Sequence, residues 1–257
     1  MRNPLVAGNW KMHGNAADIE NLLGAILEGL TDLPSVQSDV LVFPPYVYLP
    51  QVMETLQGTT VKVGAQDVDH RENGAVTGGV SASMLQDLGC RYVIVGHSER
   101  RSLFGETDPI VAAKFRQSLA AGLTPIVCVG ESLDQRNAGS TLEVVNEQLR
   151  AVLDTVDPGV FRQAMVAYEP VWAIGTGESA SPAQAEAVHL ALRNCIREFD
   201  AEVSAGVRIL YGGSVSPENA PALFAEENID GALVGGASLE GSSFTRICEA
   251  ADKSLDS

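Results

Sequence analysis

A single carboxylate at the end of a buried apolar run is the residue of this chain best suited to acid–base chemistry. Residues 164–168 are apolar or aromatic, Glu169 follows them directly, and Pro170 and Trp172 stiffen the exit. Residues 173–177 then form a loop of small residues. A carboxylate at the end of a buried strand, next to a loop of small residues, has the arrangement of a general base under a lid. A solvated glutamate in an ordinary strand–turn is the alternative.

Three further polar residues follow apolar segments. Asn9 and Lys11 come after residues 5–8, and His97 comes after residues 93–96. A lysine there could attract an anionic substrate and stabilise developing negative charge; a solvated loop lysine is the alternative. A histidine could donate a proton near a carbonyl oxygen, and a helix that begins at residue 97 would keep it neutral. A histidine satisfied by the backbone at the core edge is the alternative.

Two glycine-rich turns could bind phosphate. Gly212-Gly213-Ser214 and Gly235-Gly236 each follow an apolar run, and we expect a helix to begin just after each turn. Glycine lets main-chain N–H groups approach an anion closely, and a helix N-terminus favours negative charge. Simple turns are the alternative. Two such turns after the last two predicted strands favour phosphate, because barrels often bind it there.

Short apolar segments alternate with amphipathic segments along the chain. The apolar segments are often β-branched and apolar on both faces, which is typical of parallel strands buried on both sides. The predicted strands are residues 5–10, 40–43, 61–65, 92–95, 124–129, 164–168, 207–211 and 231–234. Apolar stripes from Ile19 to Leu30 and from Leu142 to Leu153 predict helices, and Ser181 with Pro182 is a helix start signal.

About eight β-then-α repeats in 257 residues predict an α/β fold with one (β/α)8 barrel, a parallel eight-stranded barrel with outer helices. No linker or charge block marks a second domain, so we expect residues 1–257 to form a single catalytic domain. A doubly wound open sheet is the alternative, but residues 7–11 are not its usual glycine-rich dinucleotide turn. In a barrel, the polar residues named above would face one mouth.

Composition restricts the partners and the compartment. The formal net charge of −16 with no basic run argues against nucleic acid or an anionic membrane as a partner. The four cysteines form no CxxC pair, which favours free thiols in a reducing compartment. We see no membrane-spanning apolar run and no signal peptide, so we expect a cytoplasmic protein. His13, His70 and His189 share no metal-ligand spacing, so we expect no metal site.

Taken together, these segments resemble the triosephosphate isomerase family over nearly the whole chain. The segments that carry the resemblance are Gly8-Asn9-Trp10-Lys11-Met12, Gly96-His97-Ser98-Glu99-Arg100-Arg101, residues 167–177, Tyr211-Gly212-Gly213-Ser214-Val215 and Val234-Gly235-Gly236. Their order and spacing make the resemblance highly specific.

The resemblance implies interconversion of dihydroxyacetone phosphate and D-glyceraldehyde 3-phosphate through an enediolate, in glycolysis and gluconeogenesis, without a cofactor. Glu169 would be the base and His97 the electrophile. Lys11, with Asn9 beside it, would bind substrate and stabilise its charge. Glu99 would support the site residues without contacting substrate itself. A glutamate base with a neutral histidine under a closing loop is the established arrangement of this family.

The resemblance also implies a phosphate site and a dimer. Main-chain N–H groups of Gly175, Ser214, Gly235 and Gly236 would hold the phosphate, and residues 173–177 would close over it. The loop from Asp67 to Ser81 would reach a second subunit in a homodimer.

Three residues depart from the family pattern: His13, Gly79 and Glu178. A glutamate is usual at position 79 and commonly pairs with the first arginine after the His-Ser-Glu segment, so Arg100 would lack that partner. Two alternative functions stay open, namely another phosphate-binding barrel isomerase or lyase and a non-enzymatic binding scaffold. Activity on glyceraldehyde phosphate in a coupled assay would distinguish the triose phosphate isomerase from another phosphate-binding barrel enzyme.

Overall fold

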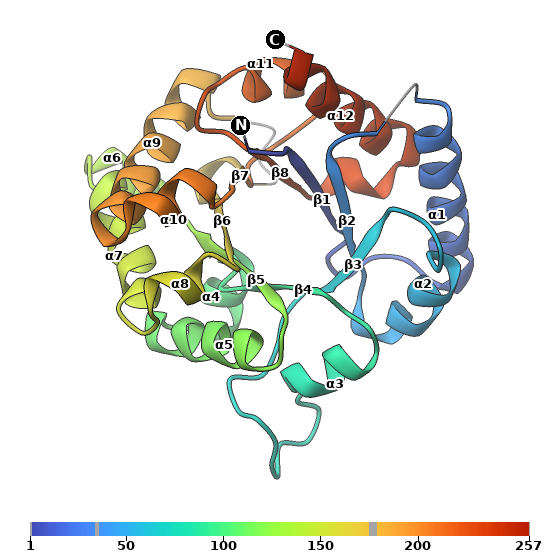
Figure 1. The fold of residues 1–257 in the computed structure, drawn as a ribbon, viewed down its shortest axis with the longest axis horizontal. Helices are drawn as coiled ribbons and strands as arrows, with labels where there is room; N and C mark the ends of the chain where they lie inside the picture. Colours follow the sequence, from blue (N-terminus) through green and yellow to red (C-terminus); the bar gives the residue numbers. More distant parts are fainter. Residues whose placement is uncertain (1, 34–35, 175–178, 257) are drawn as a thin grey trace.

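The structure is a computed structural model, and it describes residues 2–33, 36–174 and 179–256. In this part of the chain, eight parallel strands close into a barrel in chain order, with β1 paired to both β2 and β8 (Figure 1). The strands are β1 (Leu5–Asn9), β2 (Asp39–Phe43), β3 (Lys62–Ala65), β4 (Tyr92–Val95), β5 (Thr124–Val129), β6 (Met165–Tyr168), β7 (Ile209–Tyr211) and β8 (Gly231–Val234). This closure confirms the predicted (β/α)8 barrel and rules out the open doubly wound sheet. Each predicted strand is present, with ends shifted by at most two residues.

Alternate residues of a strand face opposite sides of the barrel wall, as the two-residue period of a strand requires. Leu5 and Ala7 of β1 belong to the apolar cluster inside the barrel, whereas Val6 belongs to the cluster between strands and helices. The interior cluster consists of Leu5, Ala7, Leu41, Phe43, Ile94, Ile126, Cys128, Met165, Ala167, Leu210 and Leu233. Because side chains fill the interior, a ligand must bind at one end of the barrel.

Helices surround the barrel and cover its outer wall (Figure 1). They are α1 (Ala16–Thr31), α2 (Leu49–Thr55), α3 (Ala82–Asp87), α4 (Ser98–Phe104), α5 (Asp108–Ala120), α6 (Leu133–Asn137), α7 (Thr141–Leu153), α8 (Pro158–Phe161), α9 (Pro182–Phe199), α10 (Ala201–Gly206), α11 (Ala220–Phe224) and α12 (Gly241–Lys253). Short 3-10 helices occur at η1 (Tyr46–Tyr48), η2 (Val171–Ala173), η3 (Gly236–Leu239) and η4 (Ser254–Asp256).

The predicted helix signals are largely confirmed. α1 buries its apolar stripe against the barrel. α9 begins at the predicted start, where the side chains of Ser181 and Gln184 each accept the main-chain N–H of the other. On α7 the stripe is buried at Val145, Leu149, Val152 and Leu153, but the prediction is wrong for Leu142, which is half exposed in the first turn.

A long loop, residues 66–81, joins β3 to α3 and projects away from the barrel (Figure 1). Its two sides are joined where the Asp69 N–H donates to the Val80 carbonyl at 2.8 Å. The side chain of Arg71 binds the Asp69 carboxylate at 2.8 Å within the same loop. The projection is therefore internally bonded.

All four cysteines are free and buried. Within residues 2–33, 36–174 and 179–256, no helix combines the length and apolar character needed to cross a membrane.

Candidate active site

The predicted site residues meet at one end of the barrel, where the strands have their carboxyl ends. A cavity of about 380 Å³ lies at this end. The predicted residues that line it are Asn9, Lys11, His97, Glu169, Ser214, Gly235 and Gly236. Glu99 contacts this group through Lys11. The predicted phosphate contact Gly175 lies outside the described residues.

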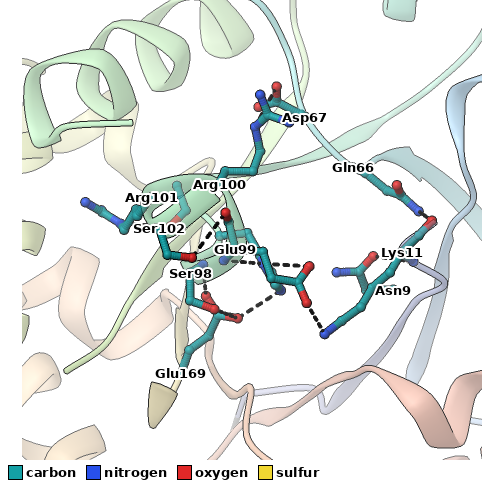
Figure 2. A network of polar contacts seen from close by, with 12 residues as sticks. Asn9, Lys11, Gln66, Asp67, Ser98, Glu99, Arg100, Arg101, Ser102 and Glu169 are labelled. Atoms are coloured by element: carbon teal, nitrogen blue, oxygen red, sulfur yellow. Dashed lines mark hydrogen bonds and ion pairs between the residues drawn. The ribbon is translucent and has the colours of Figure 1, made fainter. Parts of the chain in front are cut away.

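Glu169 follows β6 directly, and its side chain is 2% exposed. One carboxylate oxygen accepts the Ser98 main-chain N–H at 2.9 Å, and the other accepts the Ser98 hydroxyl at 3.2 Å (Figure 2). The latter oxygen also lies 3.0 Å from Nε2 of His97. Burial raises the pKa of Glu169, but His97, the Ser98 N–H and Lys11 together lower it below its ordinary value. In this position the carboxylate is ionised at neutral pH, and each of its oxygens contacts at least one donor.

His97 is the N-cap of α4, which confirms the predicted helix start. Its Nδ1 accepts the main-chain N–H of Glu99 at 3.2 Å, so the proton of a neutral His97 is on Nε2. Burial lowers the pKa of His97, but the Glu169 carboxylate outweighs it and the net direction is upward. If the carboxylate moves to a substrate, that opposing cause weakens and the imidazole becomes a neutral donor.

The main chain of Lys11 is strained, because its φ of 52° lies in a region that residues other than glycine seldom adopt. Its N–H donates to Asn9 Oδ1 at 3.0 Å, and its carbonyl accepts Gln66 Nε2 at 2.7 Å (Figure 2). Its Nζ lies 2.6 Å from Glu99 Oε1. These bonds fix the ammonium group beside the cavity.

Gln66, whose side chain bonds the main chain of Lys11, was not among the predicted residues. It follows β3 directly and also binds the carbonyl of Phe43 at 2.9 Å. The signal that identified Asn9 and His97, a polar residue at the end of an apolar run, applies equally to Gln66.

The two glycine-rich turns line the same cavity. In the described part of the chain, no protein acceptor takes the main-chain N–H groups of Ser214, Gly235 or Gly236. A Cβ atom on Gly235 would lie 3.5 Å from Cε of Lys11, so the cation lies close to this turn. Unpartnered N–H groups beside an ammonium group can bind an anion.

The prediction that a helix begins just after each turn is right for one turn only. η3 begins at Gly236, but α11 begins at Ala220, well after Ser214. Asn219 accounts for the difference, because its side chain accepts the Ser216 N–H at 2.8 Å and donates to the Ser214 carbonyl at 2.9 Å. A side chain rather than a helix therefore orders this turn.

Arg100 has carboxylate partners within its own chain, although the glutamate usual at position 79 is absent. Its Nε lies 2.9 Å from Asp67 and 2.5 Å from Glu106. Lys114 binds the same two carboxylates at 2.6 and 2.5 Å. Burial raises the pKa of Asp67, and the Lys114 ammonium opposes this rise. Two cations and two carboxylates thus form a network next to α4.

A closed (β/α)8 barrel has an acid–base pair, a cation and unpartnered N–H groups around one terminal cavity. These features define an enzyme of the TIM-barrel class whose cavity is suited to an anion. The profile of the family described as triosephosphate isomerase matches residues 4–251. The chain belongs to the triosephosphate isomerase family.

Individual relatives agree with the family match. The chain is 54% identical over 252 residues to the triosephosphate isomerase of Dechloromonas aromatica, covering 98% of this chain and 100% of the relative. It is 54% identical over 255 residues to that of Coxiella burnetii, covering 99% of both chains. It is 51% identical over 251 residues to that of Alcanivorax borkumensis, covering 98% of this chain and 99% of the relative. The similarity therefore spans complete relatives rather than one segment.

Proposed function

We propose that this protein interconverts dihydroxyacetone phosphate and D-glyceraldehyde 3-phosphate, the isomerase step of glycolysis and gluconeogenesis. One observation carries the proposal: the Glu169 carboxylate lies 3.0 Å from the Nε2 atom of His97 in the cavity that Lys11 also lines. This arrangement supplies a base, a hydrogen-bond donor and a cation for one small anionic substrate. Family membership supports the choice of substrate.

In the proposed reaction, Glu169 leaves Ser98 and removes a proton from the carbon next to the substrate carbonyl. The C–H electron pair forms the carbon–carbon double bond of an enediolate, and the carbonyl electrons move onto oxygen. The Nε2–H of His97 hydrogen-bonds that oxygen, and the Lys11 ammonium stabilises its charge. Proton exchange between the two oxygens through His97, followed by proton return from Glu169 to the neighbouring carbon, completes the isomerisation.

The proposed phosphate ligands are the main-chain N–H groups of Gly175, Ser214, Gly235 and Gly236. The unpartnered N–H groups of the last three and the nearby Lys11 support this assignment. The Ser214 hydroxyl donates to the Ala173 carbonyl at 2.9 Å, which links the phosphate turn to the segment that begins the proposed lid. A lid over residues 173–177 would exclude water, because an enediolate phosphate can otherwise eliminate its phosphate.

We further propose a homodimer through the loop from Asp67 to Ser81. The loop projects from the barrel (Figure 1), and Met12 and Val47 are apolar side chains that are 94% and 77% exposed. The Tyr48 hydroxyl donates to the Gly14 carbonyl at 3.3 Å, so the segments that carry these side chains are neighbours. Exposed apolar side chains that gather at one place are typical of an interface. Light scattering at assay concentration tests this; a fully active monomer would contradict it.

We also propose a single catalytic domain and a cytoplasmic location. Closure of the sheet into one barrel supports a single catalytic domain over residues 1–257. Four buried free thiols support a reducing compartment such as the cytoplasm.

The decisive experiment compares Glu169→Gln with Glu147→Gln, an exposed carboxylate on α7, in a coupled isomerase assay. Loss of a general base is expected to lower kcat by about 100-fold to 10,000-fold, while inorganic phosphate still binds in calorimetry. The Glu147 control should retain wild-type turnover. Unchanged turnover in Glu169→Gln would contradict the proposed role. A wild-type protein that binds phosphate without isomerase turnover would favour another phosphate-binding enzyme or a scaffold.

A further inference from the structure

The side chain of Gln148 binds both main-chain polar groups of one residue, Gly130, which directly follows β5. Gln148 lies on α7 and is partly buried. Its Oε1 accepts the Gly130 N–H at 2.8 Å, and its Nε2 donates to the Gly130 carbonyl at 3.1 Å. A primary amide is suited to this, because it offers one acceptor and one donor to a single residue. The paired bonds fix the orientation of Gly130 more strictly than one bond would.

Gly130 is in direct contact with the main chain of Glu169. A Cβ atom at Gly130 would lie 1.8 Å from the Glu169 carbonyl oxygen, so the backbones touch where a side chain would otherwise stand. On either side, the Glu169 N–H donates to the Val129 carbonyl at 2.8 Å and the Val171 N–H donates to the Glu131 carbonyl at 3.1 Å. Residues 129–131, called here the β5 ledge, therefore support residues 169–171 along their length.

Only the first residue of the β5 ledge, Val129, belongs to the strand, so Gly130 and Glu131 are not held by the barrel pairing. The ladder between β5 and β6 runs from the pair Ile126–Met165 to the pair Val129–Tyr168 and stops there. Among the residues that the structure describes, only the Gln148 side chain bonds the N–H and the carbonyl of Gly130. Without them, a partly buried N–H and carbonyl would lose their hydrogen bonds, and the peptide could reorient.

Loss of Gln148 should leave the helix that carries it in position. α7 buries Val145, Leu149, Val152 and Leu153 against the barrel, and these contacts do not involve the amide. Gln148 also does not line the cavity. Its effect on a reaction there must pass through the β5 ledge.

We propose that Gln148 is a positioning residue for the base: it holds Gly130, and thereby the β5 ledge, so that the main chain of Glu169 lies where its carboxylate can reach a substrate carbon. The inference rests on the proposed function, since it requires Glu169 to be the base. A misplacement of about 1 Å can cost about 100-fold in rate. Phosphate binding depends on the turns after β7 and β8, so the defect should appear in kcat rather than in KM.

The test compares two variants with a control. Gln148→Met keeps the length of the side chain and removes both bonds, and Gln148→Glu keeps the acceptor for the Gly130 N–H but loses the donor to its carbonyl. The control Gln51→Met removes a side-chain bond to the Ala16 carbonyl at 2.8 Å, away from the cavity. We expect Gln148→Met to lower kcat by about 10-fold to 100-fold with KM within about twofold of wild type, and Gln51→Met to leave both constants unchanged.

Gln148→Glu adds a readout that a purely structural role would not change. Protonation gives its carboxyl group a donor for the Gly130 carbonyl, so its kcat relative to wild type should rise as the pH falls. This variant also tests the proposal if Gln148→Met does not fold. A wild-type kcat in Gln148→Met, or in Gln148→Glu at neutral pH, would overturn the proposal while the wild-type protein remains an active isomerase. A raised KM with kcat intact would overturn it equally. An inactive wild-type protein would instead contradict the proposed function.

Discussion

Nε2 of His97 lies 3.0 Å from Oε1 of Glu169, so the proposed electrophile and the proposed base contact each other directly. The same carboxylate accepts the N–H and the hydroxyl of Ser98. Each contact stabilises the charged form, and a carboxylate that keeps all of them is not free to approach a carbon atom. Catalysis by Glu169 therefore requires it to exchange these donors for the substrate. The strength of the Ser98 contacts sets part of the free energy that this exchange requires.

Ser98→Ala is expected to move the acidic limb of the pH profile of kcat/KM to higher pH. Burial raises the pKa of Glu169, while its donors lower it. Removing the hydroxyl donor raises this pKa, so the ionised base is lost at a higher pH as the pH falls. Steady-state kinetics across the acidic limb measure the shift. Ser102→Ala, which removes a hydroxyl bonded to the Glu99 carbonyl on the same helix, is the control; a limb that moves equally in both variants would count against the explanation.

The main catalytic candidates could be predicted because each lies within a few residues of the end of an apolar run. In a closed parallel barrel, every strand has its carboxyl end at the same end of the barrel. Polar residues that follow different strands therefore lie close together in the folded protein. Asn9, Lys11, His97 and Glu169 line one cavity for this reason, although four repeats separate the first from the last along the barrel.

Contacts between side chains of different repeats could not be predicted in the same way. The bonds from Ser98 to Glu169 and from Gln148 to Gly130 depend on distances that no spacing along the chain encodes. The wrong helix start after Ser214 has a different cause, because the Asn219 side chain competes with helical hydrogen bonds for the nearby main chain. Which of the two sets of hydrogen bonds forms depends on the conformation of the folded loop.

Lys114→Met is expected to destabilise the fold strongly. Lys114 is 5% exposed and binds the buried carboxylates of Asp67 and Glu106. Removing a cation from such a network leaves buried charge uncompensated, so the free energy of unfolding should fall by about 3 kcal/mol or more. Urea unfolding measures it. In the control Arg150→Met, which breaks the exposed pair with Glu198, the change should stay below about 1 kcal/mol. Similar losses in both variants would refute the distinction.

His189→Gln is expected to make stability less dependent on acidic pH. Burial lowers the pKa of His189 to about 3, and the charge of Arg193 adds to the effect. In the unfolded chain a histidine titrates near pH 6.5, so below that pH the unfolded state binds one more proton than the folded state. This removes about 1.4 kcal/mol of stability per pH unit. Glutamine removes this titration and can still donate to the Asn228 carbonyl, which lies 3.1 Å from Nδ1.

The measurement for His189→Gln is the free energy of unfolding in urea at several pH values below 6.5. The slope against pH should be shallower than in the wild type by one proton. Parallel slopes for the wild type and His189→Gln would show that this histidine is not buried in its neutral form.

Gly130→Ala is expected to impair both stability and turnover. The added Cβ would lie 1.8 Å from the Glu169 carbonyl oxygen and 2.8 Å from its carbon, and neither is a flexible side chain. The β5 ledge or the main chain of Glu169 must therefore move, at a cost of about 1–3 kcal/mol and a fall in kcat of about 100-fold. Gly24→Ala, in α1 with no atom within 4 Å of the new Cβ, should instead stabilise the protein by about 1 kcal/mol and leave kcat unchanged. A destabilised Gly130→Ala protein with wild-type kcat would mean that the carboxylate keeps its place when the backbone under it shifts, and the positioning role of Gln148 would then lose its physical basis.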